Sequence, residues 1–202
     1  MEDVKIQLSD SELELMQNAD IILTKNSVLQ KMKCLLEDVQ KRQLEFSISN
    51  QPVIPGLFRV SPKISRGENY LGLPWLILDY PRISNPEDLF FIRTMFWWGK
   101  FFSSTLHVSG RHKEHLLDKI SGSYLLLKDD YIGVNTDPWT HHFEEDNYRL
   151  VSSLSETEFK DKCRQPAHLK IASQLLLEQW KEAPAVLFEK WKRLLEISGS
   201  IA

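Results

Sequence analysis

Residues 90–102 restrict the fold more than any other stretch, because seven of these thirteen residues are aromatic. Runs typical of β-strands lie on both sides of Trp98-Gly99-Lys100-Phe101, and a glycine there favours a two-residue type II′ turn. A strand pair half-exposed to water would show one polar face, whereas both faces of this pair are apolar. We therefore predict a β-hairpin over about residues 91–108 that is central in its sheet and covered on both sides.

The length of the turn determines which side chains share a face of the hairpin. A two-residue turn pairs Trp98 with Phe101 and Phe96 with Ser103. In that register Phe96, Trp98 and Phe101 share one face of the hairpin. Bulky apolar walls with a few hydroxyls and an imidazole are typical of a small-molecule site, and aromatic residues equally suit a homodimer interface. The candidate ligand-binding residues are Arg93, Phe96, Trp98, Phe101, Thr105 and His107.

Arg93 is the one charge expected in the middle of a strand, between apolar neighbours. A charge at such a position must be paired, reach solvent or bind an anion. The favoured interpretation is a structural ion pair with Asp79, which follows a continuous apolar run at residues 75–78. That run predicts a second strand covered on both faces. Binding of an anion by Arg93 is the alternative.

Two apolar stripes at helical spacing cover residues 1–46. The members of the first stripe are Leu15, Met16, Ala19, Ile22 and Leu23. The second stripe begins at Val28, whereas continuation of the first would bury Ser27 instead. This slip in phase favours a break at residues 24–27 and therefore a pair of helices.

Residues 151–202 contain three signals for helices. A capping box starts at Ser155, and Ala183-Pro184 is typical of a helix start. Between them, Gln165-Pro166 is expected to open a helix whose apolar stripe contains Leu169, Ala172, Leu176 and Trp180. His168 would then lie at the surface.

Residues 47–150 are rich in strands and turns, and they lie between the two helical ends. This order favours a single α+β domain over residues 1–202. Its sheet is predicted to be mainly antiparallel, with the aromatic hairpin at its centre and the N-terminal and C-terminal helices beside it.

The composition argues against several functional classes. The 25 Lys and Arg residues and the 28 Asp and Glu residues leave a charge of −3, so no nucleic-acid partner is expected. The chain starts without a secretory signal and has no apolar run near the ~20 residues of a membrane span. We therefore expect a cytoplasmic protein without a membrane partner. Cys34 and Cys163 are expected to be buried, and no glycine spacing predicts a phosphate-binding cofactor.

Residues 129–148 carry six carboxylates, no Lys or Arg, and the neighbouring His141 and His142. Imidazole and carboxylate together are the ligands that zinc, manganese and iron use. Neighbouring residues of an extended chain point to opposite sides, however, and the acidic spacing does not match an EF-hand. A solvated loop is therefore the favoured interpretation of this segment.

Two functions follow from these patterns. The first is the binding of a small molecule or a protein partner through a face of the aromatic hairpin, without catalysis and in a homodimer. The alternative is a metal-assisted hydrolase that uses His107, either His141 or His142, and a carboxylate such as Asp137 or Glu144.

Overall fold

The computed structural model describes residues 6–85 and 87–201, which form a seven-stranded antiparallel sheet and five helices. The helices are α1 Asp10–Gln17, α2 Ala19–Ser49, α3 Gly110–Gly122, α4 Glu156–Arg164 and α5 Ala183–Ser198. The strands are β1 Lys63–Tyr70, β2 Leu73–Ser84, β3 Leu89–Trp97, β4 Phe101–Ser109, β5 Tyr131–Gly133, β6 Tyr148–Leu150 and β7 His168–Leu175. The predicted α+β class is confirmed.

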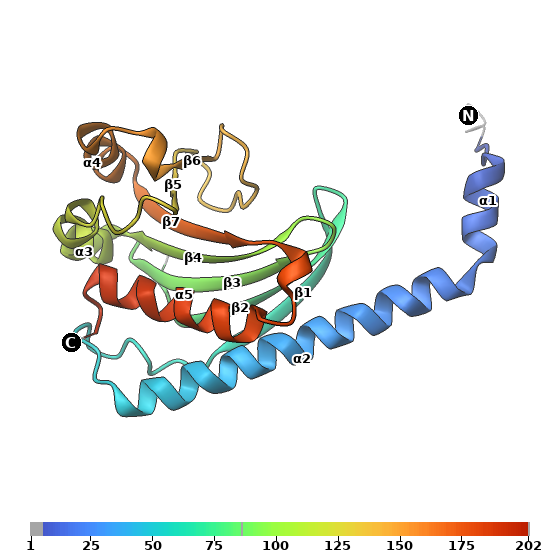
Figure 1. Ribbon diagram of the computed structural model, residues 1–202, viewed down its shortest axis with the longest axis horizontal. Coiled ribbons are helices and arrows are strands. Elements are labelled where there is room, and N and C mark those ends of the chain that lie inside the picture. Colours follow the sequence, from blue (N-terminus) through green and yellow to red (C-terminus); the bar gives the residue numbers. More distant parts are fainter. Residues whose placement is uncertain (1–5, 86, 202) are drawn as a thin grey trace.

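The strand order β1-β2-β3-β4-β7-β5-β6 places the aromatic hairpin, β3 and β4, in the middle of the sheet. Helices α2 and α5 cover one face of the sheet (Figure 1), where Leu36 of α2 and Leu187 of α5 belong to the same buried cluster as Leu78 and Phe102. Residues 134–147, which we call the covering loop, pack on the opposite face through aromatic contacts to β3 and β4. Both faces of the hairpin are therefore covered, as predicted.

The predicted two-residue turn is wrong, because the hairpin closes through three residues. Trp97 pairs with Phe101 and Phe96 pairs with Phe102. The Lys100 N–H donates to the Trp97 carbonyl at 3.1 Å, and the Trp98 N–H donates to the carbonyl of Pro74 in β2 at 3.0 Å. Trp98 is thereby bonded to β2 instead of the β3–β4 ladder, and Gly99 adopts the left-handed φ of +66° that the turn requires.

This longer turn sorts the hairpin side chains onto faces that differ from the prediction. Phe96 and Phe102 face the helices, whereas Met95, Trp97 and Phe101 belong to a separate cluster on the other face. A change of one residue in a turn changes the strand register and therefore which residues share a face.

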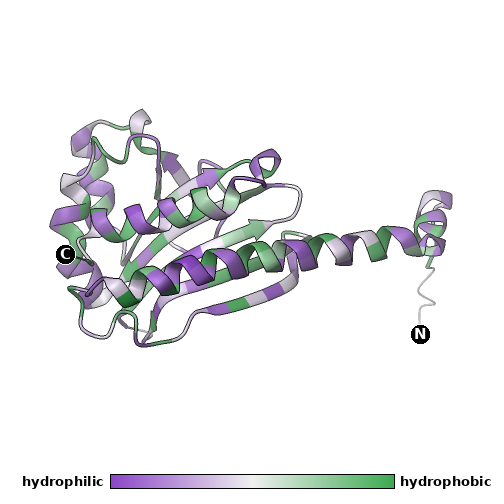
Figure 2. Ribbon diagram, turned by 60° about the horizontal axis from the view of Figure 1, so that its bottom comes forward, coloured by the Kyte–Doolittle hydropathy of each residue, from purple (hydrophilic) through white to green (hydrophobic). Residues whose placement is uncertain are grey.

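The predicted helix break at residues 24–27 is also wrong. The helices separate at Asn18, whose side chain caps α2 by accepting the Asp20 N–H at 3.1 Å. Helix α2 then continues without interruption to Ser49. The slip in phase has no structural consequence because the first stripe is not buried at all: α1 and the start of α2 project away from the sheet (Figures 1 and 2).

Residues 168–175 form the strand β7, so the helix predicted to follow Gln165-Pro166 is wrong. Strand β7 pairs with β4 along its length. Leu169 and Ile171 join the core beneath the helices, while His168 and Lys170 are buried on the opposite face. The predicted helical stripe combined residues from both faces of this strand, since Leu169 and Ala172 lie on opposite faces.

The two cysteines differ in their surroundings. Cys163 is buried, as expected, whereas Cys34 is exposed on α2, and both are free thiols. In the described part of the chain, no helix combines the length and the apolar character that crossing a bilayer requires.

Candidate functional site

An apolar groove of about 620 Å³ lies between α2, the tip of the aromatic hairpin and the turn that follows β7. We call it the hairpin groove. The residues that line it are Val28, Lys31, Met32, Leu35, Phe96, Trp98, Gly99, Phe102, Leu177 and Trp180. It is the first of three regions that the candidate residues occupy.

The walls of the hairpin groove follow from the periodicity of α2 and from the register of the hairpin. Val28, Met32 and Leu35 recur at helical spacing and therefore share one side of α2. Phe96 contacts Trp98 edge to face, with ring centroids 6.4 Å apart. Trp98 is half-buried and Trp180 is half-exposed, so the groove is open to solvent at its aromatic rim. Apolar walls with few polar groups suit an apolar or amphipathic ligand.

The second region is a layer of buried polar side chains between the sheet and the covering loop. Arg93 forms a two-bond ion pair with Asp79, in which both N–O distances are 2.8 Å. Nη1 of Arg93 also lies 2.9 Å from Nε2 of His141 in the covering loop. The predicted pairing of Arg93 with Asp79 is confirmed, and the arginine has its charge satisfied within the protein.

His107 is fully buried in this layer, with its ring 4.7 Å from that of Phe91, 5.7 Å from that of Trp139 and 5.4 Å from that of His168. In the described part of the chain, neither ring nitrogen has a hydrogen-bond partner. Burial lowers the pKa of His107 to about 3, with further contributions from the neighbouring His168, Lys170 and Arg93. The imidazole is therefore neutral at physiological pH.

Lys170 joins the covering loop to the sheet. Its side chain is fully buried, and Nζ donates to the Thr140 carbonyl at 2.8 Å and to Oδ1 of Asn147 at 3.2 Å. The same ammonium group lies 5.0 Å from the ring centroid of Tyr148. Burial lowers the pKa of Lys170 to about 8, so the amine is still mostly protonated at pH 7 and able to donate both bonds.

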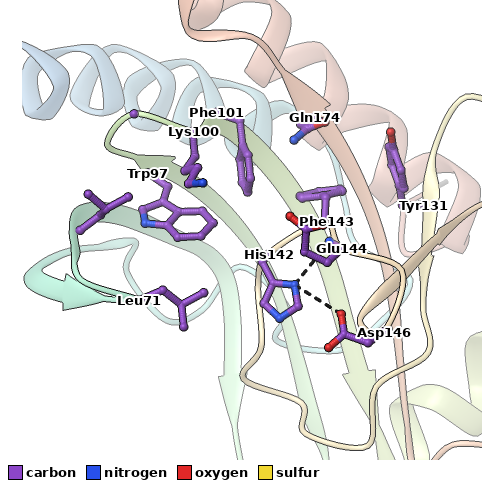
Figure 3. A pocket seen from close by; sticks show the side chains of 12 residues that line it. Leu71, Trp97, Lys100, Phe101, Tyr131, His142, Phe143, Glu144, Asp146 and Gln174 are labelled. Atoms are coloured by element: carbon purple, nitrogen blue, oxygen red, sulfur yellow. Dashed lines mark hydrogen bonds and ion pairs between the residues drawn. The ribbon is translucent and has the colours of Figure 1, made fainter.

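Beside this layer, the tip of the hairpin and the covering loop border an open pocket of about 960 Å³ (Figure 3). Phe101 and Phe143 meet edge to face in it, with ring centroids 4.9 Å apart. Nδ1 of His142 lies 3.8 Å from a carboxylate oxygen of Asp146 and accepts the Glu144 N–H at 3.4 Å. The imidazole of His142 thus has the Asp146 carboxylate and the backbone N–H of Glu144 as neighbours in this pocket.

The structure does not bring the six candidate residues together in one site. Phe96 and Trp98 line the hairpin groove, whereas Phe101 lines the pocket of Figure 3. The other three candidates, Arg93, Thr105 and His107, lie on the loop-side face of the sheet. The acidic segment does meet the hairpin, since Trp139 of the covering loop stacks on Phe91 at 5.9 Å.

The residues of the metal-assisted alternative are not arranged as a ligand set. Within residues 6–85 and 87–201, no group of three or more His, Cys, Asp or Glu side chains is placed to hold a metal ion. His141 contacts Arg93, and the Asp137 carboxylate accepts the Trp139 N–H at 2.9 Å and the Thr140 hydroxyl at 3.1 Å. The structure therefore gives no support to a metal centre formed from these residues.

Sequence reasoning missed the contribution of α2 to the hairpin groove and the contribution of β7 to the buried polar layer. Met32 and Leu35 were expected in a core stripe, and they form a wall of the hairpin groove. Lys170 and His168 fell in a segment assigned to a helix. The alternation His168-Leu169-Lys170-Ile171 is a signal that could have indicated a strand with one polar face.

The hairpin groove, the buried polar layer and the pocket of Figure 3 have to be interpreted from their own chemistry. Comparison with protein-family models, with curated proteins and with solved structures gives no match for this chain.

Proposed function

We propose that this protein is a binding module that takes an amphipathic helix of a protein partner into the hairpin groove. The observation that carries the proposal is the groove itself, an open trough of about 620 Å³ whose walls are nearly all apolar or aromatic. An amphipathic helix that lays its apolar face into such a trough is a recurring mode of peptide recognition.

The shortage of polar groups favours a helix over a small molecule. Small-molecule sites combine apolar walls with several convergent polar groups that orient the ligand. Among the side chains of the hairpin groove, only Lys31 and the indole nitrogens of Trp98 and Trp180 can offer a polar contact. Lys31 is exposed on α2, and it suits an acidic residue next to the apolar stripe of the bound helix.

The energy of binding would come from a few apolar anchors. Burial of one Leu, Ile, Met or Phe side chain is worth about 1.5–3 kcal/mol. Four anchors, the number in an i, i+3, i+4, i+7 stripe, therefore supply at most about 12 kcal/mol. Association costs at least about 4 kcal/mol, so about 8 kcal/mol remain, and the tightest affinity expected is about micromolar. Because this energy comes from burial, a charge placed in the wall of the groove should remove most of it.

The test uses a fluorescein-labelled designed peptide with Leu at positions i, i+3, i+4 and i+7 and Glu between them. Binding to the full chain is measured by fluorescence anisotropy. The substitution Met32→Glu should weaken binding at least tenfold, because it buries a carboxylate against Phe96. The matched control Leu125→Glu changes an exposed leucine outside the groove and should leave affinity unchanged.

Failure of the peptide to bind a form of the chain whose groove is unoccupied, or equal binding by Met32→Glu and Leu125→Glu, would overturn the proposal. A scrambled peptide of the same composition distinguishes recognition of a helical stripe from general adhesion to apolar surface. Equal binding of the scrambled peptide would also contradict a helix-specific groove.

A further inference from the structure

The N-terminal helical segment exposes an apolar surface that no other residue of 6–85 and 87–201 covers. We call residues 10–24 the arm; it consists of α1 and the first turns of α2. Every residue of the arm is exposed. Its large apolar side chains are 42–67% exposed, and they are Leu13, Leu15, Met16, Ile21, Ile22 and Leu23.

Such an arm needs a partner for physical reasons. Helix α1 has only eight residues and buries none of them, whereas isolated helices shorter than about 12–15 residues are marginal in water. Six exposed large apolar side chains within fifteen residues indicate an interaction site. Asp10, Glu12, Glu14 and Asp20 lie in the arm, and residues 6–24 contain no Lys or Arg. That acidity disfavours anionic membranes, which attract basic helices, and leaves a protein partner.

We propose that the arm of one copy occupies the hairpin groove of a second copy, so that the chain forms a two-fold symmetric dimer. The inference rests on the proposed function of the groove and names its occupant. The apolar residues of the arm match the apolar walls of the groove. The acidic residues of the arm match Lys31 in the groove and Lys181, whose Nζ lies 5.8 Å from the ring centroid of Trp180 at the rim.

The arm cannot fill the groove of its own chain. Helix α2 is continuous from Ala19 to Ser49, so the part of the arm after Asn18 is fixed on the helix axis. Helix α1 is about 12 Å long at 1.5 Å per residue. Even if α1 folded back along α2 at Asn18, its far end would lie beside residue 26 and would not reach Met32 or Leu35. A second copy is free of this restriction.

Two antiparallel α2 helices satisfy both contacts at once. If the two-fold axis passes near residue 25, residues 19–22 of each copy lie along residues 28–31 of the other. Helix α1 turns off the α2 axis at Asn18, so it has to realign about Asn18 to extend the contact to Met32 and Leu35. Such an isologous contact is the commonest form of homodimer. The Lys25 ammonium near the axis is paired with Glu68 at 2.6 Å, which reduces repulsion between the two copies of this lysine.

The oligomeric state of the full chain tests the inference, measured by sedimentation velocity at micromolar concentration. The natural sequence should be a dimer. Ile22→Glu in the arm and Met32→Glu in the groove should each raise the dimer dissociation constant about 100-fold, because each substitution occurs at both symmetric contacts. Leu125→Glu, the control outside both surfaces, should remain a dimer. A monomer for the natural sequence, or a dimer that Met32→Glu does not weaken, would overturn the inference.

Chemical cross-linking tests the trans geometry. With α1 realigned on the α2 axis, residue 16 of one copy lies beside the exposed Cys34 of the other, while the two Cys34 residues lie about 27 Å apart along the helices. A short bis-maleimide should therefore join two chains in Met16→Cys and fail to join them in the natural sequence. A link confined to one chain would contradict the dimer.

Different results would contradict the proposed dimer and the proposed peptide-binding function of the groove. The monomeric variant Ile22→Glu leaves the groove unoccupied, so it should bind the designed peptide at least as tightly as the natural chain. Peptide binding with no dimer in the natural sequence overturns the dimer alone. A dimer dissociated by Ile22→Glu, in a variant that still binds no peptide, overturns the peptide-binding groove alone.

Discussion

Acid should destabilise this protein through His107. The folded state holds this imidazole neutral, with a pKa of about 3 against an ordinary value of 6.5. As the pH falls below 6.5, the unfolded chain binds a proton at this position that the folded chain does not bind. Stability therefore falls with pH throughout the window from 6.5 to 3. A pH of 5 is about 1.5 units below the pKa of this histidine in the unfolded chain. The free energy of unfolding is therefore about 2 kcal/mol lower at pH 5 than at pH 7.5.

The measurement is urea unfolding at pH 7.5, 6.5, 5.5 and 5.0, for the natural chain and for His107→Phe. Phenylalanine keeps an aromatic ring beside Phe91 and Trp139 but cannot be protonated. Burial also lowers the pKa values of His141 and His168, so both proteins should lose stability in acid. The difference between their profiles isolates His107 and should reach about 2 kcal/mol at pH 5. Parallel profiles would refute the assignment of a buried neutral imidazole.

Three further substitutions or measurements probe the polar layer and the thiols. Lys170→Met leaves two buried acceptors without a donor and should cost about 1–3 kcal/mol, with faster hydrogen exchange in the covering loop; unchanged exchange there would contradict its role as an anchor. Asp79→Asn removes the anionic partner of Arg93 and should cost about 3 kcal/mol by urea unfolding, whereas a loss below 0.5 kcal/mol would place the pair among solvent-screened ones. Ellman titration should find one reactive thiol, Cys34, in the folded chain and two in urea, because burial raises the pKa of Cys163 to about 12.

The hairpin shows what local patterns can predict and where they stop. The density of aromatic residues was sufficient to predict a central hairpin covered on both faces. The turn length was not predictable from Gly99 alone, because the deciding contact is the hydrogen bond from Trp98 to Pro74, 24 positions earlier in the chain. That long-range bond determines the register, and the register determines whether Phe96 and Phe101 share a site.

Residues 168–175 show a second limit. Leu169 and Ala172 fit a helical stripe, whereas the alternation at residues 168–171 fits a strand, so the local pattern alone does not decide between the two. The strand forms because β4 offers it a complete ladder of partners, so that the context of the sheet overrides local propensity. The pairing of Arg93 with Asp79 was predictable for the opposite reason. A charge buried in a strand has few solutions, and the carboxylate of Asp79, directly after the apolar run at residues 75–78, is the nearest of them.

The arm follows from a mismatch between the length of α2 and the length of the sheet that it covers. Along α2, the buried residues begin only at Leu29, so its first ten residues extend about 15 Å past the packed part of the helix. Apolar residues nevertheless continue beyond the packed part of α2, since Ile21, Ile22 and Leu23 are exposed and cover no surface of the described residues. The sequence of the arm therefore has the apolar content of a core helix, but the described part of the chain supplies no core for it. A groove of matching chemistry begins at Val28, directly after the arm on the same helix, and a second copy brings that groove to the arm.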